Sequence, residues 1–385
     1  MMKVMTIFGT RPEGIKMAPV VKTIEQDKEL ECVFVNTAQH REMLDQVTAL
    51  FDIKPDYDLD LMKPGQKVEE LIGLMFSKLT AIIQLEKPDL ILVHGDTTST
   101  FVGAYAAFMQ KIPVGHVEAG LRTDNMYSPF PEEMNRQMVG RIATYHFAAT
   151  QKNKENLLKE AVKDKHIYVV GNTVIDALLE ITSRDFQFND DLKHIFSNGL
   201  KTILLTTHRR ENYHELANIY QAINQLINDY DDIQVVFPIH KNPYIRKKVK
   251  ESLQHSNRVH LIEPLDYETF VHVMKHSYVV ITDSGGIQEE APSLGKPVLV
   301  ARNTTERQEG VDAGTLKLVG TSARKIYDEC SNLLSNQLEY KKMEMIINPF
   351  GTGQTASKIV DLIKSTILMD QLGEHLGVKE NEIIG

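Results

Sequence analysis

Three carboxylates and two histidines lie close together in the segment 92–136 of this sequence. Short apolar runs at 90–93 and 112–115 each lead into a histidine and, two residues later, an acid. The five polar residues are His94, Asp96, His116, Glu118 and Glu132. Proton transfer requires acid and base groups within reach of the same atom, and carboxylates and histidines are the usual groups. We therefore expect acid–base chemistry here if the fold brings these side chains together.

Crowding would itself prepare these acids for opposite roles. Neighbouring carboxylates raise one another's pKa, so one can stay protonated near neutrality while another accepts a proton. Two local alternatives stay open. Asp96 could cap a helix that begins near Thr98, and the side chains at 94, 96, 116 and 118 could hold a metal ion, because residues two apart on a strand share a face. We favour proton transfer and expect no metal.

A second group of residues could bind a phosphate. An apolar run ends at Thr282, and Ser284, Gly285 and Gly286 then form a turn that opens a helix. Glycines at such a turn let backbone N–H groups approach a phosphate, and the helix N-terminus favours negative charge. A tight turn without a ligand would have the same sequence. Glu290, one turn into the helix, could accept hydrogen bonds from ribose hydroxyls or serve as a cap.

Basic residues follow other expected strand ends. Arg11 and Lys16 flank the turn after the first strand, His208 follows the first strand of the second half, and Arg307 lies in a later loop. Together such groups suit a diphosphate. Taken singly, each could also be an exposed or purely structural side chain.

The segments between these residues alternate between strand and helix patterns. Short apolar runs separated by helix-length segments are typical of buried parallel strands. The expected strands are 3–8, 31–36, 89–94, 112–117, 145–149, 167–170, 202–206, 235–238, 259–262, 279–282 and 297–300. This alternation predicts an α/β protein with parallel, doubly wound sheets, in which the carboxyl ends of the strands line the ligand crevice.

The length of 385 residues exceeds what one hydrophobic core usually supports. The alternation restarts after Gly171, and we therefore predict two Rossmann-like domains with a deep cleft between them. The predicted divisions are a first domain at 1–171, a second at 172–354, a C-terminal helix at 355–370 and a tail at 371–385. The polar segment 184–199 is expected to be the entry to the second domain.

Composition excludes several classes of function. The formal net charge of −9 argues against nonspecific nucleic-acid binding as a main role. No apolar segment is long enough to predict a membrane span. The two cysteines, Cys32 and Cys330, lie far apart without metal-ligand spacing, which fits a reduced, cytoplasmic setting.

Eight ordered segments of the chain resemble the bacterial non-hydrolysing UDP-N-acetylglucosamine 2-epimerases. They run from Phe8 to Arg307 and read FGTRPEGIKMAP, HGDTTST, VGHVEAGLRT, PFPEEMNR, GNTVID, THRREN, TDSGGIQEEAPSLGKPVL and NTTER. The resemblance implies the GT-B architecture, two Rossmann-like domains around a deep cleft. It also implies that the C-terminal helix packs back on the first domain and that the protein is a homodimer.

The resemblance further implies an activity, the reversible conversion of UDP-GlcNAc to UDP-ManNAc by inversion at C2. UDP leaves the anomeric carbon as the C2 proton is removed, which gives a bound 2-acetamidoglucal, and UDP then adds back with a proton on the opposite face. No NAD or other cofactor is expected, in keeping with the missing dinucleotide fingerprint. The product would supply ManNAc units for cell-surface polysaccharides.

The family's functional residues transfer to matching positions of this sequence. The catalytic candidates are Asp96, Glu118, Glu132 and His208. The substrate-binding candidates are Arg11, Lys16, Phe270, Ser284, Gly285, Gly286, Glu290 and Arg307, with Glu290 on the ribose and Phe270 near the uracil. Which carboxylate removes the proton and which returns it stays open.

The match to the family's activator site is only partial. Bacterial members often bind a second UDP-GlcNAc there, and Gln39 and His40 match its region. Glu42 stands where we expect glutamine, and Gly65 where some members have arginine. Three alternatives to the epimerase remain: a hydrolysing epimerase, a GT-B glycosyltransferase and a noncatalytic UDP-sugar sensor. The intact acidic set argues against the sensor, because binding a dianion gains nothing from three nearby carboxylates.

Overall fold

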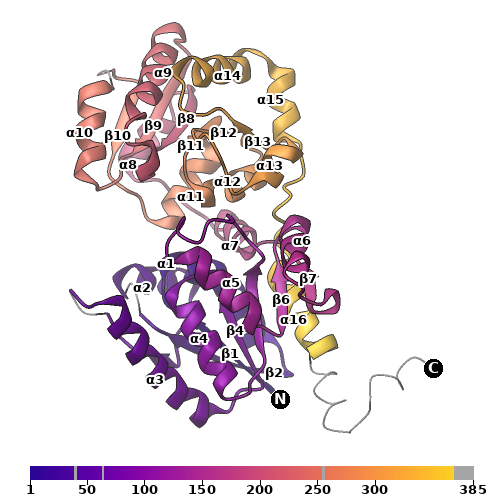
Figure 1. Ribbon diagram of the computed structural model, residues 1–385. Coiled ribbons are helices and arrows are strands. Elements are labelled where there is room, and N and C mark those ends of the chain that lie inside the picture. The colour runs from indigo at the N-terminus through magenta and orange to yellow at the C-terminus, as the bar shows by residue number, and fades with distance from the viewer. Residues whose placement is uncertain (39–40, 63–64, 254–255, 368–385) are drawn as a thin grey trace. The chain divides into compact units, whose positions relative to one another are not determined.

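The computed structural model describes residues 1–38, 41–62, 65–253 and 256–367 (Figure 1). The chain divides into two compact units. The first comprises Met1–Ala177 together with the C-terminal segment that begins at Gly351, and the second is Leu178–Phe350. The chain therefore passes from one unit to the other twice. The first passage lies within helix α7 (Thr173–Thr182), a few residues beyond the boundary predicted at 171.

The first unit is built on a seven-stranded parallel sheet of order β3-β2-β1-β4-β5-β6-β7. Its strands are β1 (Met2–Phe8), β2 (Leu30–Asn36), β3 (Tyr57–Asp58), β4 (Leu90–His94), β5 (Val114–Ala119), β6 (Tyr145–Ala148) and β7 (Ile167–Val169). Outward from β1, strands are added first on one side and then on the other. This is the Rossmann order, and the place where it reverses, between β1 and β4, is where such sheets bind ligands.

Helices surround this sheet (Figure 1). They are α1 (Arg11–Gln26), α2 (Arg41–Phe51), α3 (Val68–Glu86), α4 (Thr98–Met109), α5 (Glu132–Ile142), α6 (Gln151–Lys159), α7 and α16 (Thr355–Leu362). A 3₁₀ turn precedes β7, and a π-helical turn, Ile363–Ile367, continues α16. Helix α16 packs against α1, and Lys364 pairs with Asp27 at 2.9 Å. The returning segment is therefore an integral part of the first unit.

The second unit repeats the same plan with six parallel strands, in the order β10-β9-β8-β11-β12-β13. Its strands are β8 (Lys201–Thr206), β9 (Ile233–Pro238), β10 (Val259–Ile262), β11 (Val279–Thr282), β12 (Val298–Val300) and β13 (Leu316–Leu318). Its helices are α8 (Asp190–Phe196), α9 (Leu216–Asp229), α10 (Pro243–Ser252), α11 (Tyr267–His276), α12 (Gly285–Glu290), α13 (Gln308–Ala313), α14 (Ala323–Ser335) and α15 (Gln337–Glu344). The strand order reverses between β8 and β11.

Two features of the sequence explain these elements. The central strands are contiguous apolar runs such as 90–93 and 203–205, and they are fully buried because helices cover both faces. Helix α1 begins with a capping box, in which the Thr10 hydroxyl accepts from the Glu13 backbone and the Glu13 carboxylate accepts from the Thr10 backbone. Each unit has its own core, one around β1 and β4 and one around β8 and β11.

Three elements differ from the expectations. Helix α8 lies in the polar segment 184–199, and strands β3 and β13 were not predicted. The predicted tail at 371–385 lies outside the described residues. In the described ranges, no helix is both long and apolar enough to cross a membrane.

Candidate active site

The candidate residues of the first unit follow the carboxyl ends of neighbouring strands. Arg11 comes after β1, Asp96 after β4, and Glu118 lies at the end of β5. Glu132 is the first residue of α5. Both Glu118 and Glu132 act electrostatically on Asp96, so the structure brings the three predicted carboxylates together.

The backbone at Glu118 is unusual. Its φ is 62°, in the left-handed region that side-chain-bearing residues rarely occupy. The pairing of β5 with β6 shifts register between Val117 and Ala119, which makes Glu118 the bulged residue. A bulge turns a side chain away from the strand's regular alternation. The expectation that His116 and Glu118 share a face is therefore wrong.

The Glu118 carboxylate accepts hydrogen bonds from two donors and lies close to a histidine ring. Its Oε2 accepts from the Lys16 ammonium on α1 and from Nδ2 of Asn172 at 3.0 Å. Nε2 of His94 lies 3.6 Å from the same oxygen. Burial alone would raise the pKa of Glu118, but the Lys16 charge and the His94 contact hold it well below its ordinary value. Glu118 is therefore held in its ionised form.

The pKa of Asp96 is shifted in the opposite direction to that of Glu118. Burial raises its pKa, although Arg136 lies beside it with Nη2 2.6 Å from Oδ2. The neighbouring carboxylates of Glu118 and Glu132 act in the same direction as burial. Asp96 is not the helix cap, because the side chain of Thr97 caps α4 by accepting from Thr100 N. The carboxylate of Asp96 is therefore left for another task.

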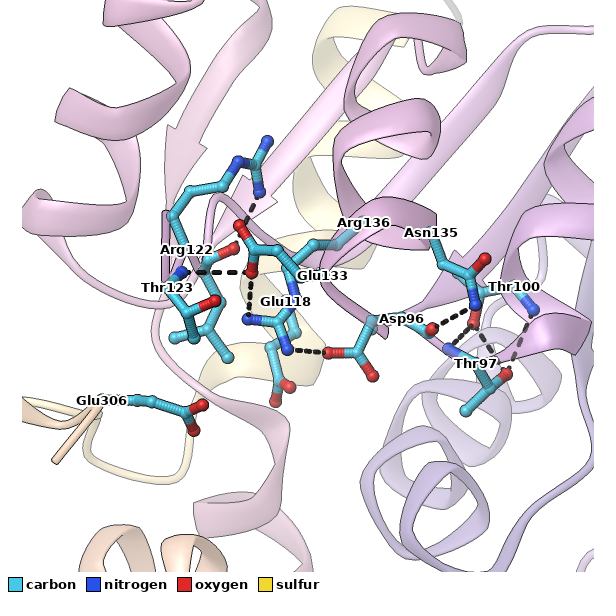
Figure 2. A network of polar contacts seen from close by, with 12 residues as sticks. Asp96, Thr97, Thr100, Glu118, Arg122, Thr123, Glu133, Asn135, Arg136 and Glu306 are labelled. Atoms are coloured by element: carbon cyan, nitrogen blue, oxygen red, sulfur yellow. Dashed lines mark hydrogen bonds and ion pairs between the residues drawn. The ribbon is translucent and has the colours of Figure 1, made fainter. Parts of the chain in front are cut away.

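Arg136 and Glu133 support Asp96, and sequence analysis missed both. Figure 2 shows the Arg136 guanidinium between the carboxylates of Asp96 and Glu133. The Glu133 side chain is completely buried and accepts from Thr123 N at 3.1 Å. Nδ2 of Asn135 donates to the backbone oxygen of Asp96 at 3.0 Å. The signal for this group was the i, i+3 spacing of acid and arginine in the segment 132–136.

Glu13 is a second supporting acid that sequence analysis missed. Its buried carboxylate accepts from the backbone of Gly9 and Thr10 on the β1–α1 turn. It also accepts from Thr97 Oγ1 at 2.6 Å and Thr100 Oγ1 at 3.0 Å, at the start of α4. Glu13 thereby joins the β1–α1 turn, after which Arg11 and Lys16 lie on α1, to the start of α4 beside Asp96.

The two histidines of the first unit have different environments. His116 is fully buried with Nε2 2.7 Å from the Gly95 oxygen, and burial lowers its pKa to about 3. It is a neutral structural residue. His94 is also buried, but its Nε2 lies 3.6 Å from Glu118 Oε2, so it contributes to the charge environment of that carboxylate.

In the second unit, Asp283 organises the loop that carries His208. The Asp283 side chain is completely buried and accepts from the backbone N–H groups of His208 and Arg209 at 3.0 Å. The ring Nδ1 of His208 also lies 3.2 Å from Asp283 Oδ1. Burial lowers the pKa of His208 although Asp283 opposes this shift.

The predicted phosphate turn follows β11 in this unit. Ser284 is the N-cap residue of α12, and its side chain makes no capping bond. A Cβ at Gly285 would lie 3.3 Å from the Arg307 guanidinium, so glycine permits that close approach. Nε of Arg307 donates to Glu289 at 2.8 Å, which fixes a nearly buried cation beside the turn. Sequence analysis missed the role of Glu289.

The remaining candidates occupy varied positions. Glu290 is buried and accepts from the Tyr267 hydroxyl at 2.7 Å, and Phe270 is half-buried on the same helix as Tyr267. Gln39 and His40 lie outside the described residues. Gly65 is exposed with a φ of 75°. Within the described part of the chain, no group of three or more His, Cys, Asp or Glu side chains could hold a metal ion.

Comparison with known proteins identifies the family. The family profile described as UDP-N-acetylglucosamine 2-epimerase matches residues 22–364. The UDP-N-acetylglucosamine 2-epimerase of Bacillus subtilis (strain 168) is 52% identical over 361 residues, 94% of each chain. Two solved structures are also similar. UDP-GlcNAc 2-epimerase from Neisseria meningitidis bound to UDP-GlcNAc is 47% identical, with TM-score 0.86 over 95% of this chain and 100% of that chain.

The second solved structure is the Methanocaldococcus jannaschii UDP-GlcNAc 2-epimerase in complex with UDP-GlcNAc and UDP. It is 34% identical, with TM-score 0.76 over 94% of this chain and 99% of that chain. These likenesses and the two Rossmann-like sheets confirm the predicted α/β, GT-B fold class. The chain belongs to the UDP-N-acetylglucosamine 2-epimerase family.

Proposed function

We propose that this enzyme interconverts UDP-GlcNAc and UDP-ManNAc without hydrolysing them. The C2 proton is removed as the bond from C1 to the UDP oxygen breaks, which gives 2-acetamidoglucal and UDP. A proton then adds to C2 on the opposite face while UDP re-forms its bond to C1. The product would supply ManNAc units for cell-surface polysaccharide synthesis.

The contrast between Glu118 and Asp96 supports the proton steps. Inversion through a planar C2 needs a base on one face and an acid on the other. Lys16 and His94 keep Glu118 ionised against the effect of burial, and burial raises the pKa of Asp96. We assign proton removal to Glu118 and proton return to Asp96 in one direction, with the roles reversed in the other. Glu132 assists from the start of α5.

The second unit supports the handling of UDP. The diphosphate leaves with negative charge and must stay bound for its return. Arg307, His208 and the turn at 284–286 supply a fixed cation, a ring donor and backbone N–H groups for that charge. Glu290 would accept hydrogen bonds from the ribose, and Phe270 would contact the uracil. Arg11 and Lys16 add positive charge from the first unit.

One experiment tests this function against its alternatives. The protein is incubated with UDP-GlcNAc in D₂O, and the sugars are followed by NMR. The proposal requires UDP-ManNAc that carries deuterium at C2. Free ManNAc with UDP would instead identify a hydrolysing epimerase, and unchanged substrate would favour a glycosyltransferase or a sensor.

The homodimer expected from the family has a suitable surface on the first unit. We define the aromatic face as Phe76, Phe101, Tyr105 and Phe108, whose rings lie within 6.4 Å of a neighbour. Tyr105 is 41% and Phe108 57% exposed, beside a cavity of about 710 Å³. Exposed aromatic clusters mark protein interfaces, and we propose a second copy of this chain as the partner.

Light scattering tests this assignment. Phe108→Glu should give monomers, because a charge would be buried at the contact. Leu338→Glu, at a residue 74% exposed in the second unit, is the matched control and should leave the dimer intact. A dimeric Phe108→Glu protein would place the interface elsewhere.

Activation by a second UDP-GlcNAc is a separate proposal, and it predicts sigmoidal dependence of the rate on UDP-GlcNAc.

A further inference from the structure

The two donors to Glu118 reach the same carboxylate oxygen, and Nε2 of His94 lies 3.6 Å from that oxygen. Lys16, Asn172 and His94 approach Oε2, and in the described part of the chain no polar partner approaches Oε1. Holding one oxygen fixes the plane of the carboxylate and leaves the other oxygen for a reacting proton. The left-handed backbone of Glu118 directs its side chain away from the regular positions of the strand. The contacts to Oε2 are therefore needed to set the orientation of the carboxylate.

Asn172 is the donor with the most restricted position. It is only 3% exposed and lies immediately before α7. Its Oδ1 accepts from Val174 N at 3.0 Å, as an N-cap residue does, while its Nδ2 donates to Glu118 at 3.0 Å. Both ends of the amide are therefore engaged, which sets its orientation.

The chain around Asn172 adds to this restriction. A Cβ built at Gly351 would lie 3.5 Å from Asn172 N, so the segment that returns to the first unit passes against it. Asn172 thus lies where the segment that leaves the first unit and the segment that returns to it are in contact. A side chain fixed in this way can hold Glu118 more firmly than the flexible Lys16 can.

We propose that Asn172 is a positioning residue that holds Oε2 of Glu118 and so presents Oε1 to the proton at C2 of the sugar. This inference rests on the proposed epimerase function. Asn172 is neither one of the catalytic candidates nor one of the substrate-binding candidates, so it adds a new residue to that function. Because Asn172 acts through Glu118, it contributes to catalysis without touching the substrate.

The substitution Asn172→Asp separates positioning from capping. Aspartate is as good an N-cap as asparagine, so the bond from Val174 N is retained. The donor to Glu118 is replaced by a negative charge, which raises the pKa of the neighbouring carboxylate. We expect the acidic limb of the kcat profile to move up by at least about one pH unit.

Two further variants keep the test decisive. Asn189→Asp makes the same change at the N-cap of α8 and should leave the profile unchanged. Asn172→Ser keeps a capping oxygen without adding charge, and its kcat should fall by about 10- to 100-fold at constant KM, the loss of one hydrogen bond to a charged group. If Asn172→Asp is too slow for a profile, the serine variant decides.

Failure of this inference differs from failure of the proposed function. A wild-type protein that forms no UDP-ManNAc would overturn the function. An active wild type with an unshifted Asn172→Asp profile, or with Asn172→Ser at wild-type kcat, would show that Asn172 only caps α7.

Discussion

The two units share one strand order and one switch point, yet they use their carboxylates differently. In the first unit, the Asp96 side chain is 23% and the Glu118 side chain 13% exposed, and each is paired with a cation. In the second, Asp283 is 0% and Glu289 4% exposed. Asp283 holds the His208 loop, and Glu289 holds Arg307. The same fold therefore leaves the acids that we propose to react partly accessible in one unit and encloses the supporting acids Asp283 and Glu289 in the other.

This difference follows from the charge that each unit is proposed to meet. Proton transfer needs carboxylates that remain accessible and whose pKa values are moved apart. A diphosphate is repelled by unpaired carboxylates, so acids near its site must be paired with cations or backbone groups. Glu306, whose side chain is 22% exposed, is paired with Arg307 in this way. Glu13 and Glu133 show that the first unit also has enclosed acids, which support the segments that carry the acids proposed to react.

The largest expected effect comes from an acid of the first unit. Asp96→Asn should lower kcat by about 10²- to 10⁴-fold, the contribution of general acid–base catalysis. UDP affinity measured by calorimetry should stay unchanged, because Asp96 is not among the groups proposed to bind UDP. A loss of UDP affinity as large as the loss of kcat would contradict the proposed division of roles between the two units.

Acidic pH should weaken the first unit through its buried histidines. Burial lowers the pKa of His116 to about 3 and of His146 to about 4, whereas unfolded histidine titrates near about 6.5. The unfolded state therefore binds more protons in this window, and stability falls as pH drops below about 6.5. At pH 5 each histidine should cost about 2 kcal/mol of unfolding free energy.

Denaturant unfolding at pH 7 and pH 5 measures this effect. His116→Gln should reduce the loss of stability between the two pH values, whatever its effect at pH 7. The exposed His214→Gln serves as the matched control. An equal loss in all three proteins would rule out His116 as a source of the pH dependence.

A cation of the second unit should govern affinity. Arg307→Lys keeps the charge but loses the paired contact with Glu289, so UDP should bind about 10- to 100-fold more weakly. Arg324→Lys, at a side chain 91% exposed, should bind UDP normally. Unchanged UDP affinity in Arg307→Lys would remove Arg307 from the UDP-binding set.

The smallest expected effect separates the cap of α4 from its neighbouring acid. Thr97→Ala loses the bond from Thr100 N and the bond to Glu13, and should lower the unfolding free energy by about 1–2 kcal/mol. Thr97→Ser keeps the hydroxyl and should be close to wild type. Wild-type stability of Thr97→Ala would show that the Thr97 hydroxyl does not stabilise the start of α4.

Much of the fold could be predicted because buried parallel strands are contiguous apolar runs. Strands of that kind, such as β4 and β8, were predicted close to their observed bounds. The two-residue β3 and the Leu-Lys-Leu strand β13 are too short for such a pattern, and α8 is a short helix in a polar segment. These elements form because tertiary packing outweighs weak local signals.

The candidate site also has features that could be predicted from the sequence and features that could not. The proximity of Asp96, Glu118 and Glu132 could be predicted because they follow strand ends, where parallel sheets gather polar groups. The supporting contacts join residues distant in sequence, such as Asn172 with Glu118, and no local pattern links them. The bulge at Glu118 was also hidden, because the left-handed backbone there occurs at a glutamate and not at a glycine.

Deuterium uptake at C2 by wild type and Glu118→Gln, measured side by side by NMR in D₂O, tests the central claim most directly. The claim is that an ionised carboxylate of the first unit removes the C2 proton. Wild type should place deuterium at C2 of UDP-ManNAc, and Glu118→Gln should place none above background while still binding UDP. Deuterium uptake by Glu118→Gln at the wild-type rate would contradict the claim.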